Sequence, residues 1–122
     1  MSRQSEIFVV DDDADLREVL GDLLTGEGYA AHLFPNGRSA LELLRGGARP
    51  HLILLDLMMP GMNGWEFREE QLRDGELKDI PVVVMTASTG FDASPLRACE
   101  ILKKPVGIDE ILEAVERNVL PS

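Results

Sequence analysis

Short apolar runs, each ending on polar residues, recur along this chain of 122 residues. The clearest, at 52–55, is aliphatic throughout and ends at Asp56, which is typical of a strand buried on both faces of a sheet. The run at 7–10 has the same character, whereas the more mixed run at 29–34 is expected at an edge of the sheet. The five predicted strands are 7–10, 29–34, 52–55, 81–85 and 101–102.

Between these runs, apolar residues recur at the three- and four-residue spacing of an amphipathic helix. The apolar face of the first helix consists of Leu16, Val19, Leu20, Leu23 and Leu24. In the last helix, which runs from near Gly107 to Leu120, that face consists of Ile108, Ile111, Leu112, Val115 and Val119. Two more helices are predicted, one around 40–44 and one over 65–73. Between the last two strands, Gly90 and Pro95 leave room for only a short helix.

Strands therefore alternate with helices along the whole chain. Apolar strands in that alternation predict an α/β fold in which a parallel sheet is covered by helices on both faces. Because the crossover connections are right-handed, the topology is restricted to a doubly wound fold. The length and the apolar fraction of 44% suit one domain over 1–122 that can bury a core without cross-links.

The composition narrows the choice of partners. The formal net charge is −10, with 22 acidic residues against 12 Lys and Arg, which argues against direct binding to nucleic acid or to an anionic membrane and favours divalent cations. Cys99 is the only cysteine, so no internal disulfide can form, and we expect a buried, unreactive thiol. The first residues form no apolar signal core and no stretch is long enough to cross a membrane, so a cytoplasmic location is expected.

Five polar residues follow or end the predicted strands: Asp11, Asp12, Asp56, Thr86 and Lys104. Because all strands of a parallel sheet point the same way, these side chains are expected to meet at one edge. Three neighbouring carboxylates repel one another unless a cation neutralises them, and Mg²⁺ is the ordinary oxygen-binding cation for such a site. A hydroxyl and a fixed ammonium group complete what phosphoryl transfer requires, so the pattern predicts a phosphoryl site.

Four motifs together resemble the receiver domain of two-component response regulators, and in particular single-domain chemotaxis regulators. They are VVDDD at 9–13, LLDLMMPGMNG at 54–64, Thr86 followed by Ala87, and Lys104 followed by Pro105. The resemblance extends over essentially the whole chain. It implies a flavodoxin-like fold with five parallel strands in the order 2-1-3-4-5. In this chain we expect the fourth helix to be shorter than the family usually has.

The resemblance also implies a role for each site residue. Asp56 would accept a phosphoryl group from a histidine kinase or a histidine phosphotransfer protein. Asp12 and Asp56 would ligate Mg²⁺ directly, Asp11 would act mainly through water, and the backbone carbonyl of Met58 would complete the ligands. Such a protein is not a turnover enzyme, and it signals to a downstream protein target as a monomer or weak dimer.

The last two residues of the site would contact the phosphoryl group itself. Thr86 would turn to form a hydrogen bond with it, and Lys104 would pair with it. The family usually has a cis peptide bond at the position of Lys104 and Pro105. Met58 and Ser88 would flank the path of an attacking water, and because neither is an acid or an amide, we predict slow self-hydrolysis.

Two departures from the family pattern concern the usual output surface. The span from Thr86 to Lys104 is about one helical turn shorter than usual, and Ile101 stands where the family usually has an aromatic residue that changes rotamer on activation. We therefore hypothesise intact phosphorylation chemistry with an altered transmission of the signal.

Several alternatives remain for individual motifs. A haloacid dehalogenase-type phosphatase could use Asp11, Asp13, Thr86 and Lys104, but it leaves Asp56 unexplained. A flavodoxin is disfavoured because acidic residues in the first loop would repel the phosphate of a flavin. A receiver-like module that is never phosphorylated is the rival within the family. Asp13 and Asp15 are expected at a helix start rather than in a calcium loop, and His32 and His51 are expected outside any site.

Overall fold

Five parallel strands form the centre of the computed structural model, which describes residues 4–121. They are β1 (Glu6–Val10), β2 (Ala30–Phe34), β3 (Leu52–Asp56), β4 (Val82–Thr86) and β5 (Glu100–Lys103). Their order across the sheet is β2-β1-β3-β4-β5, and every neighbouring pair is parallel. The predicted strand order is therefore confirmed, and the mixed strand β2 lies at an edge as expected.

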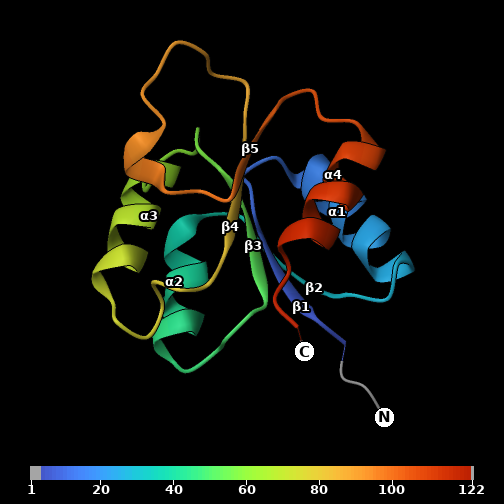
Figure 1. Cartoon of the computed structure of the whole chain (residues 1–122), viewed down its shortest axis with the longest axis horizontal. Helices are drawn as coiled ribbons and strands as arrows, with labels where there is room; N and C mark the ends of the chain where they lie inside the picture. Colours follow the sequence, from blue (N-terminus) through green and yellow to red (C-terminus); the bar gives the residue numbers. More distant parts are fainter. Residues whose placement is uncertain (1–3, 122) are drawn as a thin grey trace.

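Helices cover both faces of this sheet (Figure 1). One face is covered by α1 (Ala14–Gly26) and α4 (Ile108–Asn118), and the other by α2 (Gly37–Arg45) and α3 (Gly64–Arg73). Side chains alternate along each strand, so Leu52 and Leu54 of β3 pack with α1 and α4, whereas Ile53 and Leu55 pack with α2 and α3. All five residues of β3 and of β4 are buried, as the continuous apolar runs predict.

Each loop at the carboxyl edge of β1, β2 and β3 leads into a helix whose first residues are capped. The Asp13 carboxylate accepts hydrogen bonds from the backbone N–H groups of Asp15 and Leu16, which confirms its expected place at a helix start. Asn36 caps α2, and Asn63 forms a capping box with Glu66 at the start of α3. These caps fix where each loop ends and therefore the shape of the edge that carries the site residues.

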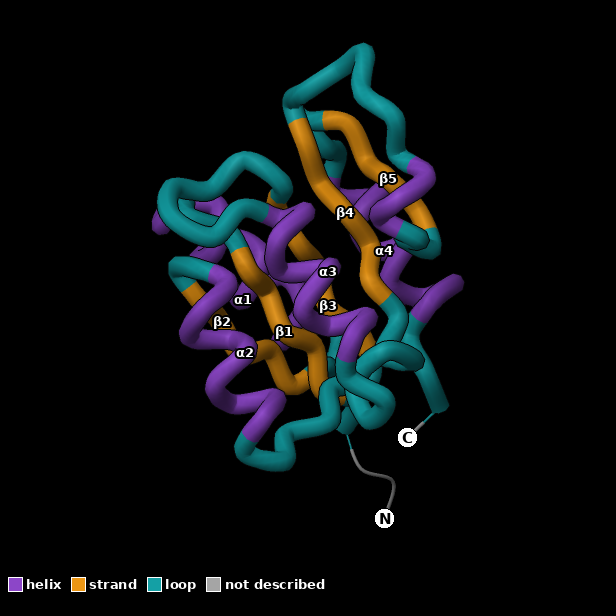
Figure 2. Tube along the Cα trace, turned by 90° about the vertical axis from the view of Figure 1, so that its left-hand side faces the viewer, coloured by secondary structure: helices purple, strands orange, loops and turns teal. Residues whose placement is uncertain are grey.

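One connection differs from the others. Residues 87–99, here called the 87–99 connection, join β4 to β5 and contain only one turn of 3₁₀ helix, Ser94–Leu96. The connection extends beyond the carboxyl ends of the strands before it turns back (Figure 2), and its 3₁₀ helix lies beside α3 (Figure 1). A shortened fourth helix is thus confirmed, and the helix labelled α4 is the last one of the fold.

The expectation for Cys99 was wrong, because its side chain is exposed. It belongs to the 87–99 connection, where no full helix packs over the sheet, so the general tendency of a free cysteine to be buried does not hold here. Two residues of the predicted helix faces are also more than half exposed, Val19 at 53% and Ile108 at 56%. Ile108 is the first residue of α4, where the helix has only begun to meet the sheet.

Both ends of the described chain lie at the amino edge of the sheet, away from the loops that carry the site residues (Figure 1). β1 begins there, and the backbone N–H of Leu120 donates to the carbonyl of His51 just before β3. No helix within residues 4–121 has both the length and the apolar character needed to span a bilayer.

Candidate functional site

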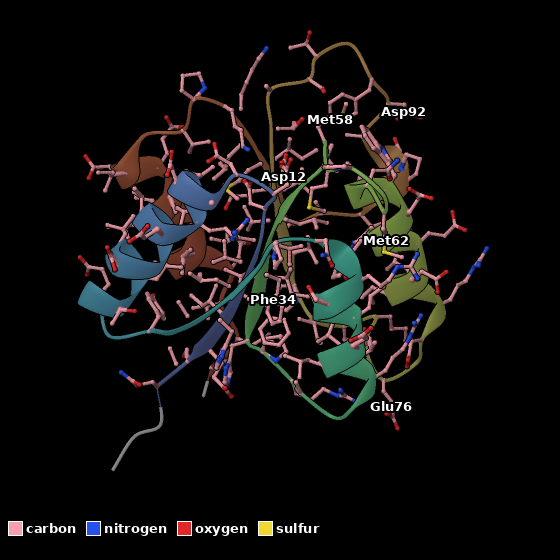
Figure 3. The ribbon with its side chains drawn as sticks, turned by 180° about the vertical axis from the view of Figure 1, so that it is seen from behind. Asp12, Phe34, Met58, Met62, Glu76 and Asp92 are labelled. Atoms are coloured by element: carbon pink, nitrogen blue, oxygen red, sulfur yellow. The ribbon has the colours of Figure 1, made fainter. Side chains whose placement is uncertain are left out.

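The carboxyl edge of the sheet brings the predicted site residues together. Asp11 and Asp12 directly follow β1, Asp56 and Thr86 are the last residues of β3 and β4, and Lys104 directly follows β5. In Figure 3, Asp12 and Met58 lie at this edge, whereas Glu76 lies at the opposite end of the molecule. The gathering follows from parallel register alone, because each strand delivers its last residue to the same edge.

Three carboxylates form the centre of this group. Asp11, Asp12 and Asp56 each offer one oxygen, and these oxygens lie within 4.8 Å of one another. Asp11 and Asp56 are buried, whereas Asp12 is exposed. At such distances two carboxylates repel by about 3 kcal/mol with an effective dielectric constant of about 20. The residues therefore suit a hard divalent cation such as Mg²⁺, which binds oxygen ligands and neutralises their charge.

Asp56 is the carboxylate most affected by its surroundings. Burial, together with the charge of Asp11, raises the pKa of Asp56 from 3.8 to about 6, although the nearby Lys104 ammonium opposes that effect. Its Oδ1 accepts a long hydrogen bond of 3.3 Å from the backbone N–H of Met58, and its Oδ2 lies 3.5 Å from Lys104 Nζ. The loose contacts leave Asp56 with free acceptor capacity toward a ligand.

Asp11 is held more tightly than Asp56. Its Oδ1 accepts from the backbone N–H of Asp13 at 2.9 Å, and its Oδ2 accepts from Lys104 Nζ at 3.0 Å. Burial alone would lower the pKa of Lys104, but the hydrogen bond and charge of Asp11, together with Asp56, raise that pKa above its ordinary value. Lys104 therefore stays charged and bridges two of the three carboxylates.

A residue that sequence reasoning missed also supports this group. Arg17 of α1 donates from Nη1 to the backbone carbonyl of Asp11 at 2.7 Å and so ties the helix to the loop after β1. The sequence gives only a weak signal for this contact: Arg17 lies in the first turn of α1, and a side chain in a helix points back toward the helix start.

Thr86 presents its hydroxyl at the same edge and is almost fully buried. The oxygen of this hydroxyl accepts a hydrogen bond of 3.0 Å from the backbone N–H of Ser88, in the 87–99 connection. The hydroxyl proton is therefore available to an acceptor in the site, while the oxygen is tied to the connection.

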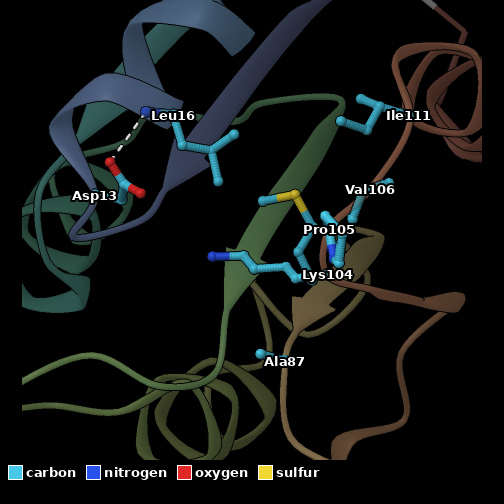
Figure 4. Close-up of a pocket in the computed structure, with 8 residues that line it drawn as sticks. Asp13, Leu16, Ala87, Lys104, Pro105, Val106 and Ile111 are labelled. Atoms are coloured by element: carbon cyan, nitrogen blue, oxygen red, sulfur yellow. Dashed lines mark hydrogen bonds between the residues drawn. The ribbon is translucent and has the colours of Figure 1, made fainter.

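A pocket of about 430 Å³ has in its lining Lys104, the residue that bridges Asp11 and Asp56 (Figure 4). It is lined by Asp13, Leu16, Met85, Ala87, Lys104, Pro105, Val106 and Ile111. Lys104 is its one cationic lining residue, and most of its other lining residues are apolar. The peptide bond between Lys104 and Pro105 is cis, as the resemblance implies.

The two histidines lie outside this group, as expected. His32 Nε2 is 3.1 Å from a carboxylate oxygen of Glu6, and His51 Nδ1 accepts from the backbone N–H of Glu6 at 2.8 Å. Glu6 is the first residue of β1, so both histidines lie toward the amino edge of the sheet.

Comparisons with known proteins agree with this geometry. A family described as the response regulator receiver domain matches residues 7–116. The DNA-binding transcriptional regulator NtrC of Escherichia coli is 36% identical over 117 residues, which cover 93% of this chain and 24% of NtrC. The response regulator MprA of Mycolicibacterium vanbaalenii is 37% identical over 113 residues, which cover 87% of this chain and 46% of MprA. The chain thus spans about a quarter to a half of these relatives.

Solved structures match over nearly the full chain. The chemotaxis protein CheY4 of Vibrio cholerae superposes with a TM-score of 0.88 at 26% identity, covering 96% of this chain and 100% of CheY4. The receiver domain of the sensor histidine kinase PA1611 of Pseudomonas aeruginosa, solved with a magnesium ion in its active site cleft, has a TM-score of 0.86 at 22% identity. It covers 95% of this chain and 98% of that domain, and at this identity it supports the fold alone.

Proposed function

The chain belongs to the response regulator receiver domain family, and on this premise we propose that Asp56 accepts a phosphoryl group from a histidine kinase or a histidine phosphotransfer protein. The observation that carries the proposal is the group of Asp11, Asp12 and Asp56 at one sheet edge, with Lys104 beside it. The added charge then changes the binding of a downstream protein. With a net charge of −10, direct binding of this chain to nucleic acid is not expected.

Mg²⁺ is the proposed cofactor, and when bound it supplies positive charge to a phosphoryl oxygen. Asp12 and Asp56 are the proposed direct ligands, together with the backbone carbonyl of Met58. Both oxygens of Asp11 already accept hydrogen bonds from protein donors, which supports a role for Asp11 through water rather than by direct contact. The exposure of Asp12 supports an ion that keeps several of its own waters.

In the proposed step, a carboxylate oxygen of Asp56 forms a bond to phosphorus while the bond between phosphorus and the donor nitrogen breaks. The electrons of that bond stay on the donor imidazole, so no oxidant or further reactant is needed. Lys104 Nζ, 3.5 Å from Asp56, would contact the transferred phosphoryl group, and the Thr86 hydroxyl would donate its proton to another phosphoryl oxygen.

Intact mass tests this proposal directly. Purified protein is incubated with a small-molecule phosphodonor, with and without Mg²⁺, as wild type, Asp56→Asn and the control Asp22→Asn on the outer side of α1. One magnesium-dependent phosphoryl increment in wild type and Asp22→Asn, absent from Asp56→Asn, is the expected result. An unchanged wild-type mass would indicate either a module that is never phosphorylated or one that accepts a phosphoryl group only from its kinase. Steady phosphate release that survives Asp56→Asn would favour the phosphatase alternative.

The lifetime of the phosphorylated form is a second proposal about this site. The Met58 side chain is 58% exposed and Ser88 is short, so neither side chain can orient an attacking water as an acid or amide does. Self-hydrolysis is therefore slow, and Met58→Asn shortens the lifetime of the phosphorylated protein by about tenfold. Loss of the phosphoryl increment is followed by mass, with Leu43→Asn on α2 as the control. Equal lifetimes for wild type and Met58→Asn would contradict the prediction.

A further inference from the structure

Arg68 of α3 is a buried cation that has no carboxylate partner among residues 4–121. Its side chain is almost fully enclosed, with 4% of the residue exposed. The guanidinium donates to three neutral oxygens: from Nε to the carbonyl of Leu96 at 2.6 Å, from Nη2 to the carbonyl of Arg97 at 2.8 Å, and from Nη1 to Gln71 Oε1 at 2.8 Å. Buried charges are ordinarily paired, so this arrangement requires an explanation.

Two of these acceptors belong to the 87–99 connection. The carbonyls of Leu96 and Arg97 lie at the end of its 3₁₀ helix, where backbone carbonyls lack partners within the helix. Arg68 therefore provides the hydrogen bonds and the positive charge that this helix end needs. If the connection moved away, the buried guanidinium would lose two acceptors, and such a loss is costly.

The same segment stores backbone strain. Arg97 has φ 47° and ψ 36°, a left-handed conformation that side chains other than glycine rarely adopt. The hydrogen bond from Arg68 to the Arg97 carbonyl holds this conformation in place. The far end of the connection, at Arg97, is thus strained and at the same time held by Arg68 of α3.

The other end of the connection is tied to the phosphoryl site. The backbone N–H of Ser88 donates to the Thr86 hydroxyl, which is the group proposed to turn toward a phosphoryl oxygen. Between the two ends, the ring of Phe91 packs edge-on against Trp65 of α3, with ring centroids 5.3 Å apart. Trp65 is the only tryptophan of the chain, so its emission reports on this contact.

We propose that Arg68 is a positioning residue that holds the 87–99 connection in its unphosphorylated arrangement. When Thr86 binds a phosphoryl group, it favours a different arrangement of the first part of the connection, and the contacts of Arg68 oppose that change. This inference rests on the proposed phosphorylation of Asp56. When Thr86 turns, Ser88 loses its acceptor, the first part of the connection shifts, and the contact between Phe91 and Trp65 changes. Arg68 limits how far this shift extends along the connection, because it holds the end at Leu96 and Arg97. The connection thereby takes the place of a switching helix.

The test follows Trp65 emission and intact mass in the same samples. In wild type, phosphorylation by a small-molecule donor with Mg²⁺ changes the emission as the phosphoryl increment appears. In Arg68→Met, the emission before phosphorylation already resembles that of the phosphorylated wild type. The change in emission on phosphorylation is then at most about one third of the change in wild type. The affinity for Mg²⁺, measured by titration, stays that of wild type, which a general loss of structure would not allow.

Two variants keep the inference falsifiable. Arg45→Met removes an exposed arginine of α2, whose ion pair is with Glu70 rather than with the connection, and it keeps the wild-type emission change. Arg97→Gly preserves both carbonyl acceptors and removes the strain, so the connection stays closer to its unphosphorylated arrangement and the emission change is smaller. If Arg68→Met does not fold, Arg97→Gly and hydrogen exchange over residues 87–99 in the wild type decide the question.

The outcomes separate the two proposals. A phosphoryl increment without any emission change in wild type overturns the role of the connection and leaves the proposed function intact. An emission change that is equal in wild type, Arg68→Met and Arg97→Gly overturns the role of Arg68. No increment in wild type, either with the small-molecule donor or with a phosphorylated histidine phosphotransfer protein, overturns the proposed function, and with it the inference.

Discussion

The carboxyl edge of β1, β3 and β4 and the 87–99 connection lie next to each other but are built in different ways. At the edge, the position of each site residue follows from strand register and from a continuous apolar run before it. In the connection, one short 3₁₀ helix is held by Arg68, which lies 28 residues before Leu96 in the chain. Local pattern thus determines the first region, whereas the second depends on contacts with residues far away in the sequence, namely Arg68 and Trp65 of α3.

This difference indicates where the two regions tolerate change. The edge lies on strands buried on both faces, so a small displacement there disturbs the core as well as the site. The connection has few buried side chains, so it can move while the sheet stays intact. The proposed phosphorylation chemistry, which needs fixed geometry, and the proposed response, which needs movement, are therefore assigned to separate parts of the fold.

The largest effect is expected where the edge meets α3. A Cβ on Gly64 would lie 2.7 Å from the Cα of Leu57 and 2.8 Å from the carbonyl oxygen of Asp56, both backbone atoms that cannot give way easily. Gly64→Ala should lower the free energy of unfolding by about 3 kcal/mol and weaken Mg²⁺ binding, because Asp56 must shift. Urea unfolding and Mg²⁺ titration measure both. Gly75→Ala is the control, since a Cβ there meets nothing within 4 Å; equal stability of the two variants would refute the prediction.

The next effect tests the charge at the edge. The pKa of Asp56 is about 6 in the folded protein against 3.8 for the free group, so the folded state binds the proton more tightly. In magnesium-free buffer this contribution to stability is present below pH 4 and is lost as the pH rises through 6, by about 3 kcal/mol in total. Asp56→Asn should remove this loss and be more stable than wild type at pH 7 by up to about 3 kcal/mol.

Urea unfolding at several pH values in EDTA provides the measurement for Asp56. Asp12→Asn is the matched comparison, because Asp12 is exposed and contributes least to the raised pKa of Asp56. It should stabilise the protein much less. A wild-type stability that does not fall relative to Asp56→Asn between pH 4 and pH 7 would show that Asp56 is not strained by its neighbours.

A smaller effect is expected in the connection. Arg97→Gly removes the left-handed strain at φ 47° and should raise the free energy of unfolding by about 1 kcal/mol. The greater conformational entropy of glycine in the unfolded chain offsets part of this gain. Urea unfolding measures it, and Arg73→Gly, within the last turn of α3, should instead destabilise. A loss of stability in Arg97→Gly would mean that its side chain contributes more than the strain costs.

The smallest effect concerns Cys99. Because its thiol is exposed, a maleimide reagent should label the folded protein at a rate close to that of the urea-unfolded chain, with no loss of helix signal in circular dichroism. Strong protection in the folded state would show that the connection packs over this residue in solution.

Strand endings and apolar runs are local features, so the sequence predicted the edge strand and the residues that meet at the carboxyl edge. The strand order was implied by the resemblance to receiver domains. The sequence also indicated from Gly90 and Pro95 that little helix would form between β4 and β5. It could not predict that Arg68 would be buried, since an arginine in an amphipathic helix is ordinarily solvated. Nor could it predict the exposure of Cys99, which depends on what packs over the connection rather than on the thiol itself.

The position of the chain ends determines where a fused tag or domain would lie. β1 starts at the amino edge of the sheet, and α4, which runs back against the strands, ends there too, on the side opposite the acidic residues (Figure 1). A fluorescent protein or an affinity tag fused after residue 121 would leave from that side and keep the phosphodonor's approach clear. Because of the same polarity, a second domain joined after α4 would lie on the far side of the molecule from the carboxyl edge of the sheet.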